Sequence, residues 1–374
     1  MDKNGKSKCN VMHVGKHSII CPQLKVHGSP MHTVTHTKYL GDIVAADSRN
    51  DLNIKSRVSK GMGNITRVMN ILEKVTLGSH YYKTAILLRE SIFLSALLIN
   101  SESWHGVTAE NINQLESLDK LLLRKILKTP ISTPTEAMYL ELGILRIRTI
   151  VKARRINFLH YLLNRKETEM ISQVFSVQWS RPDKNDWSIL VKQDLSDFNL
   201  DANLSNIKRK SKWSFKNLVR IKAQEYEFNQ LMKDKQKHTK LDNLWYSKLE
   251  TQKYLELANL NKNEAQTIFK YRTRMAKFGE NFRGNKSFVI CPLCHTHPDS
   301  QKMSYENCPV LVKNIKIPGE YEDIFKTYIP KYVVQALMDI EKFRDEFLSQ
   351  IEANSTRQHA SWMGASDNVI YLNS

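Results

Sequence analysis

Apolar residues recur at three- and four-residue spacings through most of the chain that follows residue 50, a pattern typical of amphipathic helices. It predicts helices over residues 50–75, 81–100, 109–127, 135–142 and 146–164. Thr108 has the residue type of an N-cap for the third of these helices, and Gly143 suits the end of the fourth. We therefore expect a helical region early in the chain.

Residues 8–46 show a different pattern. A short apolar run at residues 11–14 is followed by glycines and prolines at short intervals, as in strands joined by turns. This predicts a small β region at the N-terminus. The expected fold class is mainly α with a small N-terminal β region.

The second half of the chain is more polar. Residues 175–213 contain the turn signal Arg181-Pro182-Asp183 and indicate a boundary or linker. Residues 214–277 read as a basic helical stretch, and an amphipathic helix is expected within residues 318–350. The last residues, 355–374, are expected to be a loose tail.

The net charge of the chain gives the strongest indication of a binding partner. The 374 residues hold 56 Lys and Arg against 38 Asp and Glu, a formal net charge of +18. Such an excess attracts polyanions, so RNA or DNA is the expected partner. Hydrophobic residues make up 41% of the chain, which is more than a disordered chain contains. The basic cluster predicted to bind nucleic acid is Lys208, Arg209, Lys210 and Lys212.

Aromatic residues are interleaved with these basic residues, a mixture that suits base stacking. They are Trp213, Phe215, Trp245, Tyr246, Tyr254 and Tyr271. Aromatic side chains at helical spacing are as often part of a core. Both interpretations stay open at this point.

Nothing in the sequence indicates a membrane or secretory protein. No apolar segment of a signal peptide follows the polar start, and the longest apolar stretch, residues 91–100, is too short to span a bilayer. Five cysteines do not form a paired disulfide framework. We expect an intracellular protein, nuclear or cytoplasmic and not secreted, with no membrane partner and with an oligomeric state that the sequence leaves open.

Three of the cysteines are clustered. Cys291 and Cys294 form a C-x-x-C, and Cys308 follows. Two cysteines at this spacing can reach one ion from a tight turn, so we expect one Zn²⁺ held by Cys291, Cys294, Cys308 and a histidine. His297 is the preferred fourth ligand, with His295 or none as alternatives. A redox C-x-x-C is less favoured because no βαβ pattern surrounds it.

Several segments carry a family likeness. Residues 8–16, KCNVMHVGK, resemble motif D of non-LTR retrotransposon reverse transcriptases, and residues 36–44, HTKYLGDIV, resemble their motif E. The helical region is similar to the thumb of these enzymes, including Arg89, residues 115–119 and residues 139–143. Residues 271–275, followed by the C-x-x-C, look like the entry to their C-terminal zinc knuckle.

The resemblance implies a division of the chain. The expected parts are a partial palm (1–48), a helical thumb (49–174), a basic helical region (175–285), a CCHC-like knuckle (286–312), C-terminal helices (313–354) and a tail (355–374).

The resemblance also implies roles for particular residues. Lys8 matches the motif D lysine, the only candidate for a catalytic group, and Tyr39, Leu40 and Gly41 match the primer grip. Arg272 and Arg274 are expected to contact nucleic acid.

Two features depart from the family pattern. Met303 stands where the knuckle has a histidine, and thioether sulfur is a poor zinc ligand. The chain also lacks a Tyr-x-Asp-Asp motif and any segment before Lys8 that holds the other catalytic aspartate. Polymerisation needs carboxylates that bind two Mg²⁺ ions. Mg²⁺ is thus expected only if another molecule supplies the missing palm.

Three hypotheses remain. The leading one is a nucleic-acid-binding, catalytically inactive C-terminal portion of a reverse transcriptase. The second is an accessory segment of an active RNA-directed DNA polymerase, which associates with a complete enzyme or with its upstream part. The third is an interaction protein that derives from a transposable element and has no nucleic-acid role.

Overall fold

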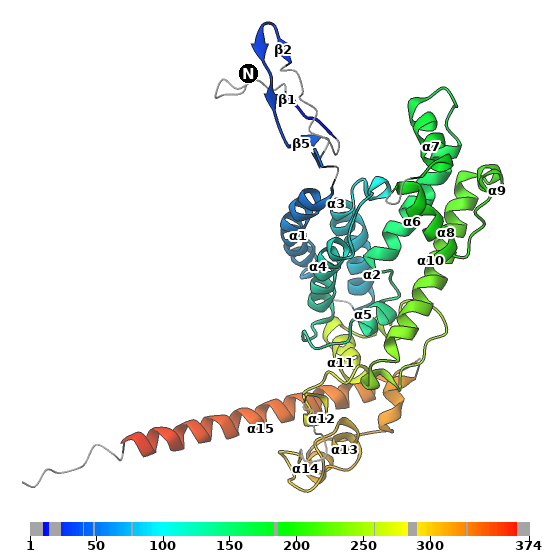
Figure 1. The fold of residues 1–374 in the computed structure, drawn as a ribbon. Helices are drawn as coiled ribbons and strands as arrows, with labels where there is room; N and C mark the ends of the chain where they lie inside the picture. The colour runs from blue at the N-terminus through cyan, green and yellow to red at the C-terminus, as the bar shows by residue number, and fades with distance from the viewer. Residues whose placement is uncertain are drawn as a thin grey trace, which may run out of the picture.

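The structure, a computed structural model, describes residues 10–14, 24–39, 41–47, 49–75, 78–182, 186–257, 259–282, 290–326 and 328–364. It is mainly helical with a small N-terminal strand region, as the sequence pattern predicts (Figure 1). In the described ranges no helix is both long enough and apolar enough to cross a membrane.

The N-terminal strands form three small pairs that extend away from the helices (Figure 1). They are β1 (Asn10–Val11) with β4 (His32–Thr33), in parallel, and two antiparallel pairs, β2 (Lys25–Val26) with β3 (Ser29–Pro30) and β5 (His36–Tyr39) with β6 (Asp42–Ala45). Most of their described side chains are exposed. Few buried contacts therefore hold this region to the rest of the molecule.

The helical body follows the predicted boundaries closely. Its helices are α1 (Asp51–Leu72), α2 (Gly78–Leu88), α3 (Ser95–Leu97), α4 (Ala109–Leu127), α5 (Thr135–Leu142) and α6 (Ile147–Leu163). The Thr108 hydroxyl accepts a hydrogen bond from the Asn111 N–H and caps α4, as expected. The helix predicted over 81–100 is instead divided, because a π-helical turn, Arg89–Leu94, joins α2 to α3.

The predicted boundary or linker, residues 175–213, is largely helical in the described part of this range. It lies in a second helical group: α7 (Met170–Ser180), α8 (Trp187–Asp197), α9 (Leu204–Arg209) and the long α10 (Lys212–Lys235). Val191 and Leu195 of α8 and Val219 of α10 share a buried cluster with Ile156 of α6. The predicted division at residue 174 falls inside α7, because apolar residues spaced among polar ones pack onto α6.

The C-terminal part wraps back onto the helical body. It contains short 3₁₀ turns (Thr239–Leu241, Lys253–Glu256 and Tyr321–Phe325), α11 (Lys262–Arg272), α12 (Gly279–Phe282), α13 (Gln301–Glu306), α14 (Pro309–Asn314) and α15 (Lys331–Gly364). The basic stretch 214–277 is thus helical at its two ends, with turns between. The helix α15 runs past the predicted end at residue 350 and through the first part of the predicted tail. Residues 365–374 lie outside the described residues.

Buried ion pairs connect these parts. The Arg89 guanidinium donates to both carboxylate oxygens of Asp119 at 2.7 and 2.6 Å, and the Tyr139 hydroxyl donates to Asp119 at 2.8 Å. Glu141 accepts from Tyr246 at 2.6 Å and from Arg272 at 3.2 Å. The first network joins the π-helical turn, α4 and α5, and the second joins α5 to α11. The residues that carry the thumb resemblance therefore meet in one core.

Candidate metal centre and nucleic-acid interface

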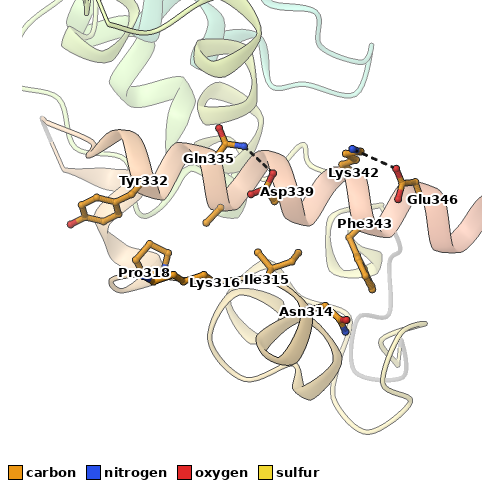
Figure 2. A pocket seen from close by; sticks show the side chains of 11 residues that line it. Asn314, Ile315, Lys316, Pro318, Tyr332, Gln335, Asp339, Lys342, Phe343 and Glu346 are labelled. Carbon is orange, nitrogen blue, oxygen red and sulfur yellow. Dashed lines mark hydrogen bonds and ion pairs between the residues drawn. The ribbon is translucent and has the colours of Figure 1, made fainter.

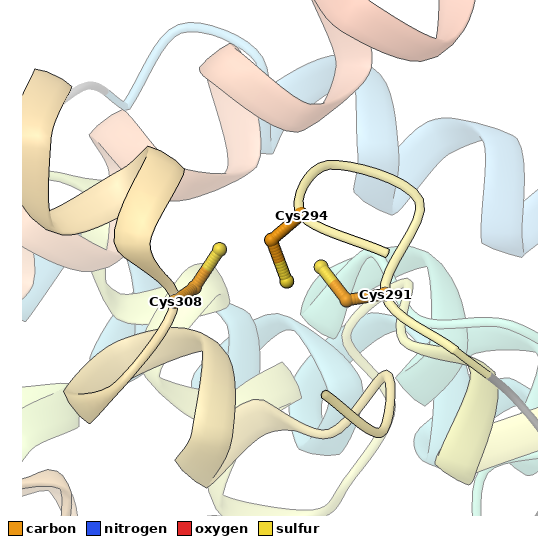
Figure 3. Close-up of side chains that lie close together, drawn as sticks. All are labelled: Cys291, Cys294 and Cys308. Atoms are coloured by element: carbon orange, nitrogen blue, oxygen red, sulfur yellow. The ribbon is translucent and has the colours of Figure 1, made fainter. Parts of the chain in front are cut away.

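The three cysteine sulfur atoms come together between α13, α14 and α15. Cys291 and Cys294 lie in a tight turn, and Cys308 directly precedes α14 (Figure 3). All three sulfur atoms lie within 4.8 Å of one another. Two backbone hydrogen bonds close the turn: Cys291 N–H donates to the His297 carbonyl at 2.7 Å, and His295 N–H donates to the Cys291 carbonyl at 3.0 Å.

This spacing fits a single metal ion. Sulfur atoms bound to one tetrahedral Zn²⁺ are separated by about 3.8 Å, given a Zn–S bond of about 2.3 Å. Burial raises the pKa of the Cys294 thiol, but hydrogen bonds from the Thr296 side chain and from backbone N–H groups outweigh it and lower that pKa to about 6. Burial raises the pKa of the Cys308 thiol to about 11. Of these two thiols, that of Cys294 is thus the more readily available as a thiolate.

Neither histidine joins the sulfur atoms. His295 is exposed with a left-handed backbone (φ 54°), and no ring nitrogen of His297 belongs to the group. The role of His297 as fourth ligand stays a prediction: its backbone carbonyl closes the turn, and in this structure its ring nitrogens do not belong to the sulfur group. Met303 lies on α13, where its sulfur accepts from the Asn307 amide at 3.7 Å.

An arginine that the sequence analysis missed lies against this cluster. Arg344 of α15 is 3% exposed, and its Nη1 is 4.0 Å from the Cys291 sulfur. Its Nη2 donates to the Lys277 carbonyl at 3.2 Å and pairs with Asp299 at 2.9 Å. The guanidinium carbon also lies 4.2 Å from the ring centroid of Phe278. No local motif marks Arg344, since it reaches the cysteines only through packing of α15.

The basic cluster predicted on residues 208–212 lies on the surface. Lys208 and Arg209 end α9, Lys210 follows it, and Lys212 begins α10. All four side chains are exposed, and none of them belongs to an ion pair among the described residues, although the charge of Lys210 helps to lower the pKa of the Asp201 carboxyl. Trp213 beside them is 78% exposed. Unpaired cations next to an exposed indole are a combination that binds polyanions.

The remaining aromatic residues divide between surface and core. Trp245 is 86% exposed, whereas Phe215, Tyr254 and Tyr271 are at most 2% exposed. Tyr246 is partly buried and is held by Glu141. The core interpretation therefore holds for Phe215, Tyr254 and Tyr271, and stacking stays a prediction for the two exposed tryptophans.

Arg272, which was expected to contact nucleic acid, lies in the core. It is 4% exposed, its Nη2 pairs with Glu141, and its Nη1 donates to the Ile324 carbonyl at 2.9 Å. A guanidinium held by these buried partners is not accessible to a nucleic acid. Arg274 is partly buried and lies two residues after the end of α11, with a left-handed backbone (φ 53°).

The residues that match motifs D and E are only partly described. Lys8 and Leu40 lie outside the described residues. Tyr39 is 66% exposed at the end of β5, and Gly41, with φ 94°, forms the turn to β6. The match to motif E and the primer-grip role stay predictions.

A hollow of about 700 Å³ separates the segment after α14 from one face of α15 (Figure 2). Ile315, Pro318 and Phe343 form its apolar part. Its lining holds two cations, Lys316 and Lys342, and two acids, Asp339 and Glu346, of which Lys342 and Glu346 pair at 3.9 Å. This balance gives it no preference for an anion.

Comparison of the chain with protein-family models, with curated proteins and with solved structures finds no match.

Proposed function

We propose that this chain is a nucleic-acid-binding C-terminal portion of a non-LTR retrotransposon reverse transcriptase, without polymerase activity of its own. The observation that carries the proposal is the surface of residues 208–212, where four exposed cations, none in an ion pair among the described residues, adjoin the exposed ring of Trp213. Lysine and arginine side chains that are not neutralised by the protein displace counterions from phosphates, which makes binding strongly salt-dependent.

The metal centre supports the same function. Cys291, Cys294 and Cys308 would hold one Zn²⁺, which supplies a structural cross-link between the turn and α14. Cys308 sits at the start of α14, and Arg344 joins the cluster to α15. The cysteines would thereby keep the C-terminal helices in one arrangement.

Absence of polymerase activity is proposed from the residue types. Nucleotidyl transfer needs carboxylates that position two Mg²⁺ ions at the reacting phosphate. The sequence contains no Tyr-x-Asp-Asp. Lys8 alone could donate a proton to a leaving group but could not bind the metal ions.

A filter-binding titration of single-stranded RNA across salt tests the binding. We expect a linear fall of log affinity with log salt, with a slope near −0.7 for each phosphate contact. Replacement of Lys208, Arg209, Lys210 and Lys212 by alanine should weaken binding and flatten the slope. The matched control removes the same charge from exposed residues in α1 and directly after it: Lys55, Lys60, Arg67 and Lys74.

Two results would contradict the proposal. Equal losses in the two quadruple variants would mean that net charge, and not this surface, binds the RNA. Primer extension on an RNA template with Mg²⁺, by the chain alone, would show that it is an active polymerase.

A further inference from the structure

A pocket of about 430 Å³ lies beside the proposed nucleic-acid surface. It is bounded by α6 and the start of α10, and Glu102 of the 3₁₀ turn Ser101–Ser103 lies at its edge. Its lining consists of Glu102, Arg154, Asn157, Phe158, His160, Tyr161, Lys212, Phe215 and Lys216. The volume lies within the range of about 300–1,000 Å³ that is usual for small-ligand sites.

The charges in this pocket favour an anion. Arg154 donates through Nη1 to the Leu98 carbonyl and to the Ser101 hydroxyl, and it contacts no carboxylate among the described residues. Burial lowers the pKa of Arg154 by more than the negative charge of Glu102 raises it. Lys212 and Lys216 are exposed, and neither belongs to an ion pair among the described residues. Against these three cations the lining has one acid, Glu102, so its formal charge is +2.

Planar side chains of α6 also belong to the lining. The rings of Phe158 and Tyr161 are nearly parallel, 14° apart, with centroids separated by 5.5 Å. The Arg165 guanidinium lies 4.2 Å from the Tyr161 ring and donates to its hydroxyl. These contacts hold the Tyr161 ring in place although the side chain is 42% exposed. Pre-positioned rings lose little conformational freedom when a ligand packs on them.

A second stacked pair supports the lining. The rings of His160 and Phe215 are 17° from parallel with centroids 4.8 Å apart, and both residues are buried. His160 Nε2 is also 2.9 Å from the Lys210 carbonyl. The pocket and the basic segment of residues 208–212 are therefore parts of one rigid surface.

We propose that this pocket binds one unpaired nucleotide of a single-stranded nucleic acid, with its base against Phe158 and Tyr161 and its phosphate near Arg154, Lys212 and Lys216. This inference rests on the proposed function and narrows it to single strands. In a duplex each base is covered on both faces by its neighbours, so only an unpaired base can pack against these rings.

The test compares a labelled single-stranded RNA, the single-stranded DNA of the same sequence, and the RNA duplex, by fluorescence anisotropy. Tyr161→Leu keeps an apolar side chain but removes the ring. It should weaken binding of single strands about fivefold to a hundredfold, the range expected for one base stacked on an aromatic side chain. Duplex binding should not change, and Tyr161→Phe should bind single strands as the wild type does.

A matched control is Tyr328→Leu, which removes a ring that is 62% exposed on another part of the molecule. It should leave all three affinities unchanged. Lys216→Ala should weaken single-strand binding without affecting the fold, because Lys216 is exposed and contacts no carboxylate.

The outcomes separate the two proposals. If Tyr161→Leu binds single strands as tightly as the wild type, while alanine at residues 208, 209, 210 and 212 abolishes binding, the pocket proposal is wrong and the proposed function stands. If the affinity of the wild type for all three nucleic acids is independent of salt concentration, both the pocket proposal and the proposed function are wrong. Equal affinity for single-stranded RNA and DNA would show that the pocket contacts only the base and the phosphate. A preference for RNA would show that it also contacts the 2′-hydroxyl.

Discussion

Arg344 gives the cysteine cluster a charge partner. Three thiolates around a divalent ion carry a net charge of −1, and the guanidinium of Arg344 lies 4.0 Å from one of these sulfur atoms. Removal of that charge should therefore weaken metal retention, as the loss of an outer-shell partner does. We expect Arg344→Met to lower zinc affinity about 10- to 100-fold in a chelator competition, and Arg344→Lys to lower it less.

The control for this prediction is Lys342→Met, which removes an exposed cation from the same helix. If Arg344→Met and Lys342→Met retain zinc equally well, the arginine serves packing alone.

We predict opposite effects on the zinc stoichiometry for substitutions of a cysteine and of a histidine. Cys308→Ser removes one of the three grouped sulfur atoms and should abolish the bound zinc measured by elemental analysis. His297→Ala and His295→Ala should each retain one zinc ion, because neither ring belongs to the group. Loss of zinc from either histidine variant would mean that the turn rearranges when the ion binds.

The pair Arg89–Asp119 is predicted to be critical for stability. Both side chains are at most 2% exposed, and the charge of Asp119 and its hydrogen bonds raise the pKa of Arg89 against the effect of burial. Asp119→Ala leaves a buried guanidinium unpaired and should lower the free energy of unfolding by about 3–5 kcal/mol in urea. Glu346→Ala, at an exposed pair, should change it by less than about 1 kcal/mol.

At the scale of elements, the junction after α5 depends on a glycine. Gly143 has φ 66°, and a Cβ atom there would lie 2.1 Å from the backbone carbon of Glu250. The neighbouring chain is bound closely: Gln252 N–H donates to the Glu141 carbonyl at 2.9 Å, and the Thr251 hydroxyl donates to the Leu142 carbonyl at 3.0 Å. Gly143→Ala should therefore cost at least about 2 kcal/mol of stability, measured by thermal or urea unfolding.

Gly63 in α1 is the matched control. It has helical surroundings, and no atom lies within 4 Å of a Cβ placed on it. Gly63→Ala should stabilise the protein by about 0.5–1 kcal/mol, because alanine loses less backbone freedom in a helix. A similar small gain from Gly143→Ala would contradict the packing of α5 against residues 250–252.

At the scale of the whole molecule, the N-terminal strands and the helical body should open separately. The strands pair only two by two, and Ala45 is their one buried apolar residue among those described. The contacts of this region with α1 gather at β6, where Asp42 pairs with Arg57 and accepts from the Asn53 amide, and the Ile43 N–H donates to Asn53. We expect the amides of β5 and β6 to exchange with deuterium well before those of α1 and α4.

Equal protection of the strands and the two helices would show one cooperative unit. The wild-type chain serves as its own internal reference in this measurement, since all the amides are followed in the same sample.

The sequence by itself determined the class of fold and most helix boundaries in the first half of the chain. Periodic apolar residues and the Thr108 cap are local signals, and α4 to α6 follow them within about one residue. The C-x-x-C likewise indicated which cysteines gather, because a tight turn sets the distance between the first two.

Only the tertiary structure decided which of several similar residues reach a site. The chemistry of an arginine is the same at 272, 274 and 344, but Arg272 pairs with Glu141 in the core whereas Arg344 reaches the cysteines from a distant helix. Trp213 and Phe215 differ by two positions along α10, and one is exposed while the other is buried. The reason is physical: neighbours in sequence set local geometry, whereas burial and charge pairing depend on which surfaces pack together.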